Sequence, residues 1–567
     1  MTLPRHHLQV ASAAISSVLP EALVKSAECT AARSSVGPGP SGAPALTSAR
    51  LAAVYALSGS APSKQKSRKQ ARAESSDGKA TLVRDGEIYA AGFLAGSTAA
   101  VAASCGSDSS APQAPPNILL VVPDQLRYDW TGLNPDIGVR TPHLNALAAR
   151  GVNFENCYCA SPLCAPSRAC LAGGREYDRC GVPDNSLNYP LDQITYYTLL
   201  RQAGYHVMGC GKFDLHKPEP SWGVERQHLL QEWGISAGID SAGKWDAIRW
   251  GMDEPCDPYT AHLHDTGRVE MHRVDFGKRN EIGTFAATFP TPLPEESYCD
   301  NWIAAQGVRL LREAPQNQPW HLAVNFAGPH EPVDITKSMV SLYRDADFPQ
   351  PNRNTEFTPA KHLEIRRNYA AMIENIDAWM GKLLAEVEAR GELDNTLVVF
   401  TSDHGEMLGD HDLWMKRLPQ QASVGVPLVA AGPGVRNGVS TPALASMMDL
   451  AATFLDYAGI EVPSGMDSRS LRPVLEGISE DHREFLSSGM DPWRCVTDGR
   501  LKLVRGYAGG KAQGGSGIPV YPEGDSAAAP LLFDIQEDPF EYHNLADSAP
   551  SDVARLTAEL HGMIGVA

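Results

Sequence analysis

The chain has 567 residues, of which 43% are hydrophobic and 20% charged, and its formal net charge at pH 7 is −18. This length and composition predict a globular protein that buries a large core in more than one domain. So acidic a chain argues against nucleic-acid binding, which depends on Lys and Arg neutralising phosphates, and an anionic substrate would need local positive charge. The 11 cysteines lack the paired spacing with His that a structural zinc site needs, and any disulfides among them stay open.

Residues 1–115 are rich in Ala, Ser, Gly and Pro, show no lasting apolar period, and are predicted to be disordered or a leader. Within them, residues 90–103 form a run of small and apolar residues that is too short to span a membrane. The run leads to Cys105 and resembles a secretory signal that ends in a lipoprotein cleavage box. If residues 80–105 are such a signal, we expect an exported protein whose true start lies near residue 80. If they are an Ala-rich linker, we expect a cytoplasmic protein.

From residue 116 onward, strand-like and helix-like segments alternate, and we predict one large domain over residues 116–480. Residues 117–122 are a nearly continuous apolar run, typical of a strand buried on both faces. Four more strand-like segments each follow a helix-like one, and these pairs are 141–150 with 152–154, 197–203 with 205–208, 301–313 with 321–326, and 365–389 with 396–400. This alternation predicts an α/β fold with a large, mostly parallel sheet flanked by helices.

The pattern shifts after residue 480. Short β-like pieces at 493–496, 501–504 and 531–534 are separated by loops rich in Gly and Pro, and a last helix-like segment covers 552–563. We therefore predict a smaller C-terminal α+β subdomain over residues 481–567.

Two of the expected strands end in acidic and polar residues. Asp124 and Gln125 come just after the strand at 117–122, and Asp403 and His404 come after the strand at 396–400. Ligands of open α/β sheets bind beyond the carboxyl ends of the strands. Two carboxylates, an amide and an imidazole there could hold a divalent ion such as Ca²⁺, Mg²⁺ or Mn²⁺, which favour oxygen ligands. The alternative is that each Asp caps a helix or forms a turn.

A cysteine motif carries the strongest functional signal. Residues 164–168 read Cys-Ala-Pro-Ser-Arg, with Leu171 and Gly174 behind them. By itself, Cys164 could be a buried cysteine in a turn that leads into a helix, or a thiol activated by Arg168. The pattern Cys-x-Pro-Ser-Arg-x-x-Leu-x-x-Gly resembles the signature of the type I sulfatases, in the alkaline-phosphatase-like superfamily. In that family the cysteine is oxidised to formylglycine, whose hydrated aldehyde is the nucleophile.

Other motifs of this family occur in the same order and approximate spacing, from about residue 116 to the end. They are the segment 117–127, Gly211 with Lys212, Pro-His-Glu-Pro at 329–332, the segment 402–416, and two later stretches at 449–460 and 532–545. So many motifs in one order argue against a chance match. The resemblance implies the sulfatase fold, with residues 116–480 as its catalytic domain.

The resemblance also implies a metal site. Asp124, Gln125, Asp403 and His404 would hold the ion together with the modified Cys164. Ca²⁺ is the expected ion, with Mg²⁺ and Mn²⁺ as alternatives. Gln125 and His404 stand where many sulfatases have Asp and Asn, and this combination resembles the choline sulfatase and phosphonate monoester hydrolase branch.

The same resemblance implies that five residues bind the substrate or take part in its reaction. Arg168 and Lys212 would anchor the formylglycine hydroxyls and the sulfate oxygens, and His330 would protonate the leaving alcohol. Lys416 would contact the sulfate and the bridging oxygen, and Asn185 would reach the substrate anion. Such cations are needed because the nucleophile approaches an ester that is already negative. One hydroxyl of the hydrated aldehyde attacks sulfur, and the other later expels sulfate.

The chain departs from the family pattern at Asp214. The family reads Gly-Lys-x-His, and its His assists the second step, but residues 211–216 here read Gly-Lys-Phe-Asp-Leu-His. Either Asp214 or His216 takes over that role, or this part of the site recognises the substrate. The alternative for His216 is an exposed loop histidine. A smaller departure is Gly173, where Thr or Ser is common, and it could slow the conversion of Cys164.

Residues 217–300 match the family least. Their basic side chains could line a pocket for an anionic or sugar substrate, or they could belong to a solvated insertion; they are Arg249, His262, His264, Arg268, His272 and Arg273.

We therefore expect an enzyme that hydrolyses sulfate monoesters of a carbohydrate or small molecule, after maturation by a formylglycine-generating enzyme. We expect neither a nucleic-acid partner nor a transmembrane helix. Two alternatives stay open. A phosphonate monoester or phosphodiester hydrolase would use the same nucleophile, although Lys212 favours the sulfatase. An inactive relative that binds sulfated ligands is suggested by Asp214.

Overall fold

The computed structural model describes residues 115–567 except 218–227, 354, 510–527 and 566–567, and these residues belong to one compact unit that covers 106–567. The predicted leader, including residues 80–105, lies outside the described residues. In the described part of the chain, no helix is both long enough and apolar enough to cross a membrane.

The main sheet has eight strands in the order β4-β3-β5-β1-β6-β7-β2-β8. They are β1 (Asn117–Asp124), β2 (Val152–Tyr158), β3 (His206–Gly211), β4 (Ala237–Asp240), β5 (Trp320–Pro329), β6 (Thr396–Thr401), β7 (Leu428–Ala431) and β8 (Val439–Ser446). Strands β4, β3, β5, β1 and β6 run parallel, and β2 is parallel to β8, whereas β7 is antiparallel to both its neighbours. The prediction of a mostly parallel sheet is confirmed, and the reversed strand β7 was not predicted.

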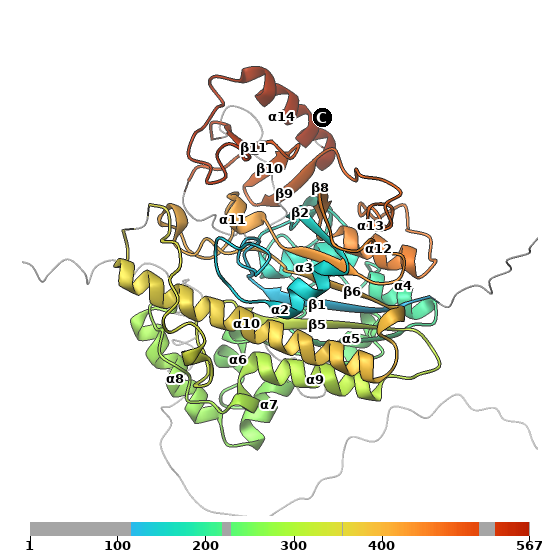
Figure 1. The fold of residues 1–567 in the computed structure, drawn as a ribbon, viewed down its shortest axis with the longest axis vertical. Helices are drawn as coiled ribbons and strands as arrows, with labels where there is room; N and C mark the ends of the chain where they lie inside the picture. Colours follow the sequence, from blue (N-terminus) through green and yellow to red (C-terminus); the bar gives the residue numbers. More distant parts are fainter. Residues whose placement is uncertain (1–114, 218–227, 354, 510–527, 566–567) are drawn as a thin grey trace, which may run out of the picture. The chain divides into compact units, whose positions relative to one another are not determined.

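Helices cover both faces of this sheet, and this explains why the residues of β1 are apolar. Ile118 and Leu120 join a buried cluster with α3, α4 and α12, while Leu119 and Val121 join a second cluster with α2, α9 and α10. A parallel strand with helices on both sides buries every side chain, which the run at 118–122 satisfies. Figure 1 shows α9 and α10 running side by side across one face. The six helices are α2 (Pro142–Ala149), α3 (Cys164–Gly173), α4 (Tyr196–Gln202), α9 (Cys299–Glu313), α10 (Pro359–Ala389) and α12 (Asp449–Tyr457).

In the described part of the segment between β3 and α9 lie β4 and four α-helices. These are α5 (His228–Glu232), α6 (Trp245–Trp250), α7 (Pro258–Asp265) and α8 (Val269–Ile282). Asp257 caps α7, since its side chain accepts a hydrogen bond from the Thr260 backbone N–H and the Thr260 hydroxyl accepts one from the Asp257 N–H. Tyr259 and Leu263 of α7 are fully buried in the cluster that contains α9. This segment therefore packs against the main domain and is not a solvated insertion throughout.

Short elements connect the rest. They are the helices α11 (Gln421–Val424) and α13 (Arg472–Leu475) and the 3₁₀ turns η2 (Tyr177–Arg179), η3 (Glu295–Ser297), η4 (Met339–Ser341), η5 (Leu393–Asn395) and η6 (Asp410–Asp412).

A second sheet of four antiparallel strands follows, in the order β12-β11-β10-β9. Helix α14 packs against it, with Leu556 and Leu560 in one buried cluster with Val496 and Leu503. The predicted α+β character of the C-terminal part is confirmed, and its boundary at residue 480 stays a prediction. The elements are β9 (Leu486–Met490), β10 (Trp493–Thr497), β11 (Leu501–Arg505), β12 (Leu531–Asp534) and α14 (Pro550–Ile564).

Candidate active site

Four neighbouring parallel strands bring most of the predicted site residues to one edge of the main sheet. In the order β3-β5-β1-β6, the strand ends carry Lys212, His330, Asp124, and Asp403 with His404. This is the edge at which open α/β sheets bind their ligands. Because these strands are neighbours in the sheet, residues more than two hundred positions apart in the sequence lie close together.

Helix α3 adds Cys164 to this edge. Cys164 is the first residue of the helix, Leu163 caps it in an extended conformation, and Gly174 ends it in the left-handed region with φ of 60°. The Asn185 Oδ1 accepts a hydrogen bond of 3.1 Å from the Ala165 backbone N–H, which satisfies one of the free amide groups at the helix start. The positive end of the helix dipole therefore lies at Cys164 and favours negative charge there.

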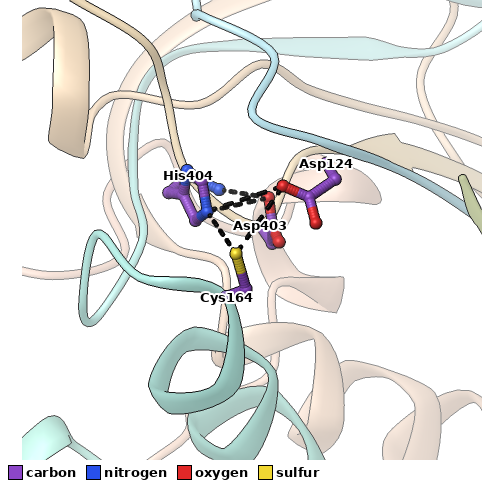
Figure 2. Close-up of side chains that lie close together, drawn as sticks. All are labelled: Asp124, Cys164, Asp403 and His404. Carbon is purple, nitrogen blue, oxygen red and sulfur yellow. Dashed lines mark hydrogen bonds and ion pairs between the residues drawn. The ribbon is translucent and has the colours of Figure 1, made fainter. Parts of the chain in front are cut away.

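The side chains of Asp124, Cys164, Asp403 and His404 converge in a buried cluster (Figure 2). The Cys164 Sγ lies 3.2 Å from His404 Nε2 and 3.7 Å from Asp124 Oδ1. His404 Nε2 also lies 3.7 Å from one oxygen of each Asp. One ligand atom of each residue lies within 4.8 Å of those of the other three, so a single ion could contact all four.

The two carboxylates of this cluster have opposite pKa shifts. Burial alone would raise the pKa of Asp124, but Lys212 and the other cations around it lower that pKa well below its usual value. Burial and the charge of Asp124 raise the pKa of Asp403. Two adjacent buried carboxylates are costly to ionise together, and a bound cation would remove that cost. The donor set therefore fits a divalent ion.

The side-chain amide of Gln125, a predicted metal ligand, is engaged by other partners. Its Oε1 accepts a hydrogen bond from Lys416 Nζ, and its Nε2 donates to Glu331 Oε2 at 2.9 Å and to Glu406. Its backbone N–H donates to Asp403 Oδ1 at 3.0 Å. In this arrangement Gln125 connects Lys416 to two buried glutamates, and its role as a metal ligand stays a prediction.

Arg168 and Lys212 supply positive charge beside the cluster. Arg168 Nε donates to Asp403 Oδ2 at 3.0 Å, and its Nη1 donates to Asn325 Oδ1 at 3.1 Å. Lys212 Nζ forms ion pairs with Asp124 and, at 3.2 Å, with Asp214 Oδ2. These buried contacts fix both cations in place, which is how a preorganised binding site for an anion is built.

Positive charge also acts on Cys164. Burial and Asp124 raise the pKa of its thiol, but Lys212, Lys416 and His404 outweigh them, so that this pKa lies well below its usual value. By contrast, burial raises the pKa of Cys157 well above the usual value. A cysteine in an electropositive site is a reactive position, whereas one buried among apolar groups is inert.

His330 and Lys416 lie together on the other side of the cluster. Lys416 Nζ is 2.6 Å from His330 Nε2, and the Glu331 Oε2 is 3.0 Å from His330 Nδ1. Burial lowers the pKa of His330, but Glu331, Asp124 and a hydrogen bond with Cys164 together outweigh it and raise that pKa to about 9. Burial would raise the pKa of Glu331 in turn, but His330 and Lys416 lower it to about 2. The carboxylate is therefore ionised and favours a protonated imidazole.

Asp214, which stands in place of the family histidine, and His216, two residues later, have different surroundings. The buried Asp214 carboxylate pairs with Lys212 and with Lys217 Nζ at 3.1 Å. Burial would raise its pKa, but the two lysines lower that pKa to about 2. The His216 ring centroid lies 6.4 Å from that of Trp233. Asp214 is thus an ion-pair partner within the site, and His216 packs against an aromatic side chain.

The sulfatase family model matches residues 116–460. The chain belongs to the sulfatase family. It is 29% identical over 480 residues to a choline-sulfatase of Rhizobium meliloti, covering 78% of this chain and 85% of that one. It is 26% identical over 490 residues to an N-acetylglucosamine-6-O-sulfatase of Bacteroides thetaiotaomicron, covering 79% and 85%.

The fold of this sulfatase is also found in solved structures. A phosphonate monoester hydrolase of Agrobacterium radiobacter has a TM-score of 0.63 and 22% identity, with 79% of this chain and 95% of that one covered. The predicted sulfatase enzyme and alkaline-phosphatase-like fold are confirmed.

A cavity of about 930 Å³ borders Cys164 in this sulfatase. Its size falls in the range of small-molecule and saccharide sites. Five predicted residues line it, namely Cys164, Asn185, Lys212, His330 and Lys416. The basic residues of the 217–300 segment that were expected to line a pocket do not all do so. Arg249 lines the cavity. By contrast, His262 bonds to Ser297, His264 to the Gly251 carbonyl, and Arg273 to Asp253.

Several residues of the site were not predicted. Lys217 and Lys244 line the cavity, but they lie in the segment that matches the family least. Asn325 holds Arg168, and its signal was available, because it is a polar residue inside the apolar run at 321–326. Glu331 belongs to the Pro-His-Glu-Pro motif, yet the motif alone did not suggest that its side chain contacts His330.

Proposed function

We propose that this sulfatase cleaves sulfate monoesters with a nucleophile formed from Cys164 by oxidation to formylglycine. The observation that carries the proposal is the position of the Cys164 Sγ. It lies 3.2 Å from His404 Nε2, borders the cavity, and is surrounded by lysines that lower its pKa. A strongly perturbed group in a cavity is the mark of a functional residue.

Asp124, Asp403, His404 and the modified Cys164 would hold a divalent ion. When bound, the ion would neutralise negative charge on the ester and on the attacking oxygen. Ca²⁺ is the proposed ion, with Mg²⁺ and Mn²⁺ as alternatives, since two carboxylates favour a hard cation while His404 adds a nitrogen donor.

Lys212, Arg168 and Lys416 would bind the sulfate oxygens, and Asn185 would add an amide contact. The support for this role is that Lys212 and Lys416 both border the cavity and that Arg168 is buried directly behind them, against Asp403 and the Lys212 carbonyl. Fixed cations in a site shielded from water stabilise charge that develops in the transition state more strongly than water does.

His330 would donate a proton to the leaving alcohol. Glu331 contacts its Nδ1, and the pKa of about 9 leaves the imidazole protonated at neutral pH. Lys416 Nζ approaches its Nε2, so a bridging oxygen bound by Lys416 would lie beside the proton of His330.

Asp214 would orient Lys212 rather than accept a proton. With a pKa of about 2 between Lys212 and Lys217, its carboxylate is too weak a base to deprotonate a hydroxyl efficiently. The loss of the family histidine therefore changes how Lys212 is held, and the role of His216, which lies beside Trp233, stays a prediction.

The substrate would be a sulfate ester of a carbohydrate or small molecule. The relatives named above act, by their names, on choline sulfate and on an N-acetylglucosamine 6-sulfate. The cavity of about 930 Å³ has room for a saccharide. Maturation would require a formylglycine-generating enzyme that acts on the motif at 164–174.

Hydrolysis of two chromogenic esters by one preparation tests this function. The protein is coexpressed with a formylglycine-generating enzyme and given 4-nitrophenyl sulfate or 4-nitrophenyl phenylphosphonate. We expect the larger kcat/KM with the sulfate, and its loss in Cys164→Ala but not in the control Cys256→Ala. Faster cleavage of the phosphonate would favour the phosphonate hydrolase alternative. No cleavage of either ester by protein that contains formylglycine would favour an inactive, ligand-binding relative.

A further inference from the structure

Two arginines that border the cavity have no carboxylate partner in the part of the chain that the structure describes. Arg249 lies near the end of α6, and Arg417 directly follows Lys416. Among the residues that the structure describes, neither guanidinium group has a carboxylate within the 4.0 Å of an ion pair. The Arg417 backbone is held by a hydrogen bond of 3.0 Å to the Pro162 carbonyl and by one of 3.2 Å from Trp493 Nε1 to its own carbonyl.

Two further lysines that line the cavity are neutralised within the protein. Lys217 Nζ lies 3.1 Å from Asp214 Oδ2 and 3.1 Å from Asp246 Oδ2. Lys244 Nζ lies 2.7 Å from Asp334 Oδ1. Arg249 and Arg417 therefore stand out as cations whose charge the described protein leaves unpaired.

The local charge opposes the charge of the whole chain. Among the described residues, six Lys and Arg line the cavity against the two acidic residues Asp246 and Glu331, whereas the chain as a whole carries −18. Lys212 and Lys416 at the catalytic end are accounted for by the reacting sulfate. A substrate with a single negative charge gives Arg249 and Arg417 no partner, while a second negative group would match them.

An exposed aromatic face lies beside Arg249. The Arg249 Cζ is 5.8 Å from the ring centre of Trp250, and the Trp250 side chain is 47% exposed. The Arg249 guanidinium group lies over this ring in a cation–π contact, which holds a cation beside an exposed aromatic side chain of the kind that packs against a sugar or aryl ring.

We propose that Arg249 and Arg417 form an outer subsite that binds a second anionic group, a sulfate or a carboxylate, on the leaving-alcohol part of the substrate. The inference rests on the proposed function, because the leaving alcohol would extend from the reacting sulfate at Cys164 into this cavity. The substrate class is then a polyanionic sulfate ester, and an ester whose alcohol part is cationic, such as choline sulfate, is disfavoured.

Kinetics with a matched pair of esters test the subsite. The pair is 4-nitrophenyl sulfate and the same ester with a ring carboxylate, 5-(sulfooxy)-2-nitrobenzoate. Choline sulfate, whose alcohol part carries a positive charge, is the comparison. In Arg249→Gln and in Arg417→Gln, the kcat/KM for the carboxylated ester relative to the plain ester should fall about fivefold, mainly through KM. Arg273→Gln, on the exposed surface of α8 and outside the cavity, is the control and should keep the ratio. Unchanged ratios in both variants, or a preference for choline sulfate that Trp250→Ala abolishes, would overturn the proposal.

A binding measurement separates this inference from the proposed function. Cys164→Ala cannot form the nucleophile, so calorimetric titration with the two aryl esters reports affinity without turnover. The subsite predicts tighter binding of the carboxylated ester and loss of that difference when Arg249→Gln and Arg417→Gln are added. If wild-type protein fails to hydrolyse sulfates but this binding difference is found, the catalytic proposal fails and the subsite stands. Equal affinities for the two esters would overturn the subsite even in an active enzyme.

Discussion

The Nε2 atom of His404 lies 3.2 Å from the sulfur of Cys164, although 240 positions separate the two residues. One residue follows β6 and the other begins α3, and both reach the carboxyl edge of the parallel sheet. Their contact joins the predicted metal site to the predicted nucleophile. The predictions below follow from that arrangement and from the charges around it.

Removal of divalent metal should abolish sulfate hydrolysis. Dialysis against a chelator would leave Asp124 and Asp403 without a neutralising ion, so activity on 4-nitrophenyl sulfate should be lost. Activity should return when Ca²⁺ is added. If the nitrogen of His404 determines which metal is preferred, Mg²⁺ or Mn²⁺ should restore it instead. Asp403→Asn should bind the ion more weakly and need a higher metal concentration for recovery. Full activity in protein that elemental analysis shows to be free of metal would contradict the proposed site.

Loss of His330 should slow the hydrolysis of esters with poor leaving groups most. A phenol such as 4-nitrophenol leaves without much help, whereas an alkyl alcohol needs a proton in the transition state. His330→Ala should therefore reduce kcat/KM about 10²- to 10⁴-fold for an alkyl or sugar sulfate and clearly less for 4-nitrophenyl sulfate. His543→Ala, an exposed histidine of the C-terminal part, is the control. Equal losses on both classes of ester would rule out His330 as the acid.

Glu331 should set the alkaline limb of the pH–rate profile. The carboxylate 3.0 Å from His330 Nδ1 is the largest of the influences that raise the pKa of the imidazole, to about 9, so the acid form persists through neutral pH and is lost above that value. Glu331→Gln removes this charge, and the alkaline limb should move to lower pH. Glu406→Gln is a matched control, because Glu406 also contacts Gln125 but makes no described contact with His330. An unmoved limb in Glu331→Gln would show that another group controls it.

Asp449 should contribute stability that is lost in acid. Its buried carboxylate pairs with Arg483 and with His482 Nε2 at 3.0 Å, and it accepts hydrogen bonds from the Ser446 and Arg469 backbones. Burial alone would raise its pKa, but Arg483 and His482 lower it well below the usual value. A lowered folded-state pKa means that the stabilisation is present above the unfolded value of about 3.9 and fades as pH falls below it.

Asp449→Asn should therefore reduce the free energy of unfolding at pH 7 by about 3–5 kcal/mol, because it leaves the buried Arg483 uncompensated. Denaturant titrations at pH 7 and pH 4 measure the effect, which should be smaller at the lower pH. Asp467→Asn, whose carboxylate is partly exposed, is the control. A variant as stable as the wild type at pH 7 would contradict this role.

The sequence predicted the elements that carry the site because their patterns are local. The apolar run at 118–122 became β1, and the segment at 365–389 became most of α10 (Pro359–Ala389). The acidic residues after β1 and β6 indicated a site at the sheet edge, since parallel neighbours end at the same edge. The order of neighbouring strands was not predicted, because it depends on long-range pairing that no local pattern encodes.

The parts that were missed depend on tertiary contacts. Four apolar residues at 428–431 do not reveal that β7 runs antiparallel to β6 and β2. The amide of Gln125 can serve as a metal ligand or as a link between Lys416 and Glu331, and only its surroundings favour the second arrangement. Lys217 and Lys244 enter the cavity from a segment whose helices had no family motif to indicate their position.

The mass of one peptide tests the central claim most directly. Trypsin releases residues 151–168, which contain Cys164, from protein that was coexpressed with a formylglycine-generating enzyme and that hydrolyses 4-nitrophenyl sulfate. Conversion of the thiol to the aldehyde lowers the mass of this peptide by about 18 Da, and we predict that shift in the active preparation. An active preparation in which the peptide carries only the unmodified thiol would contradict the assignment of Cys164 as the precursor of the nucleophile.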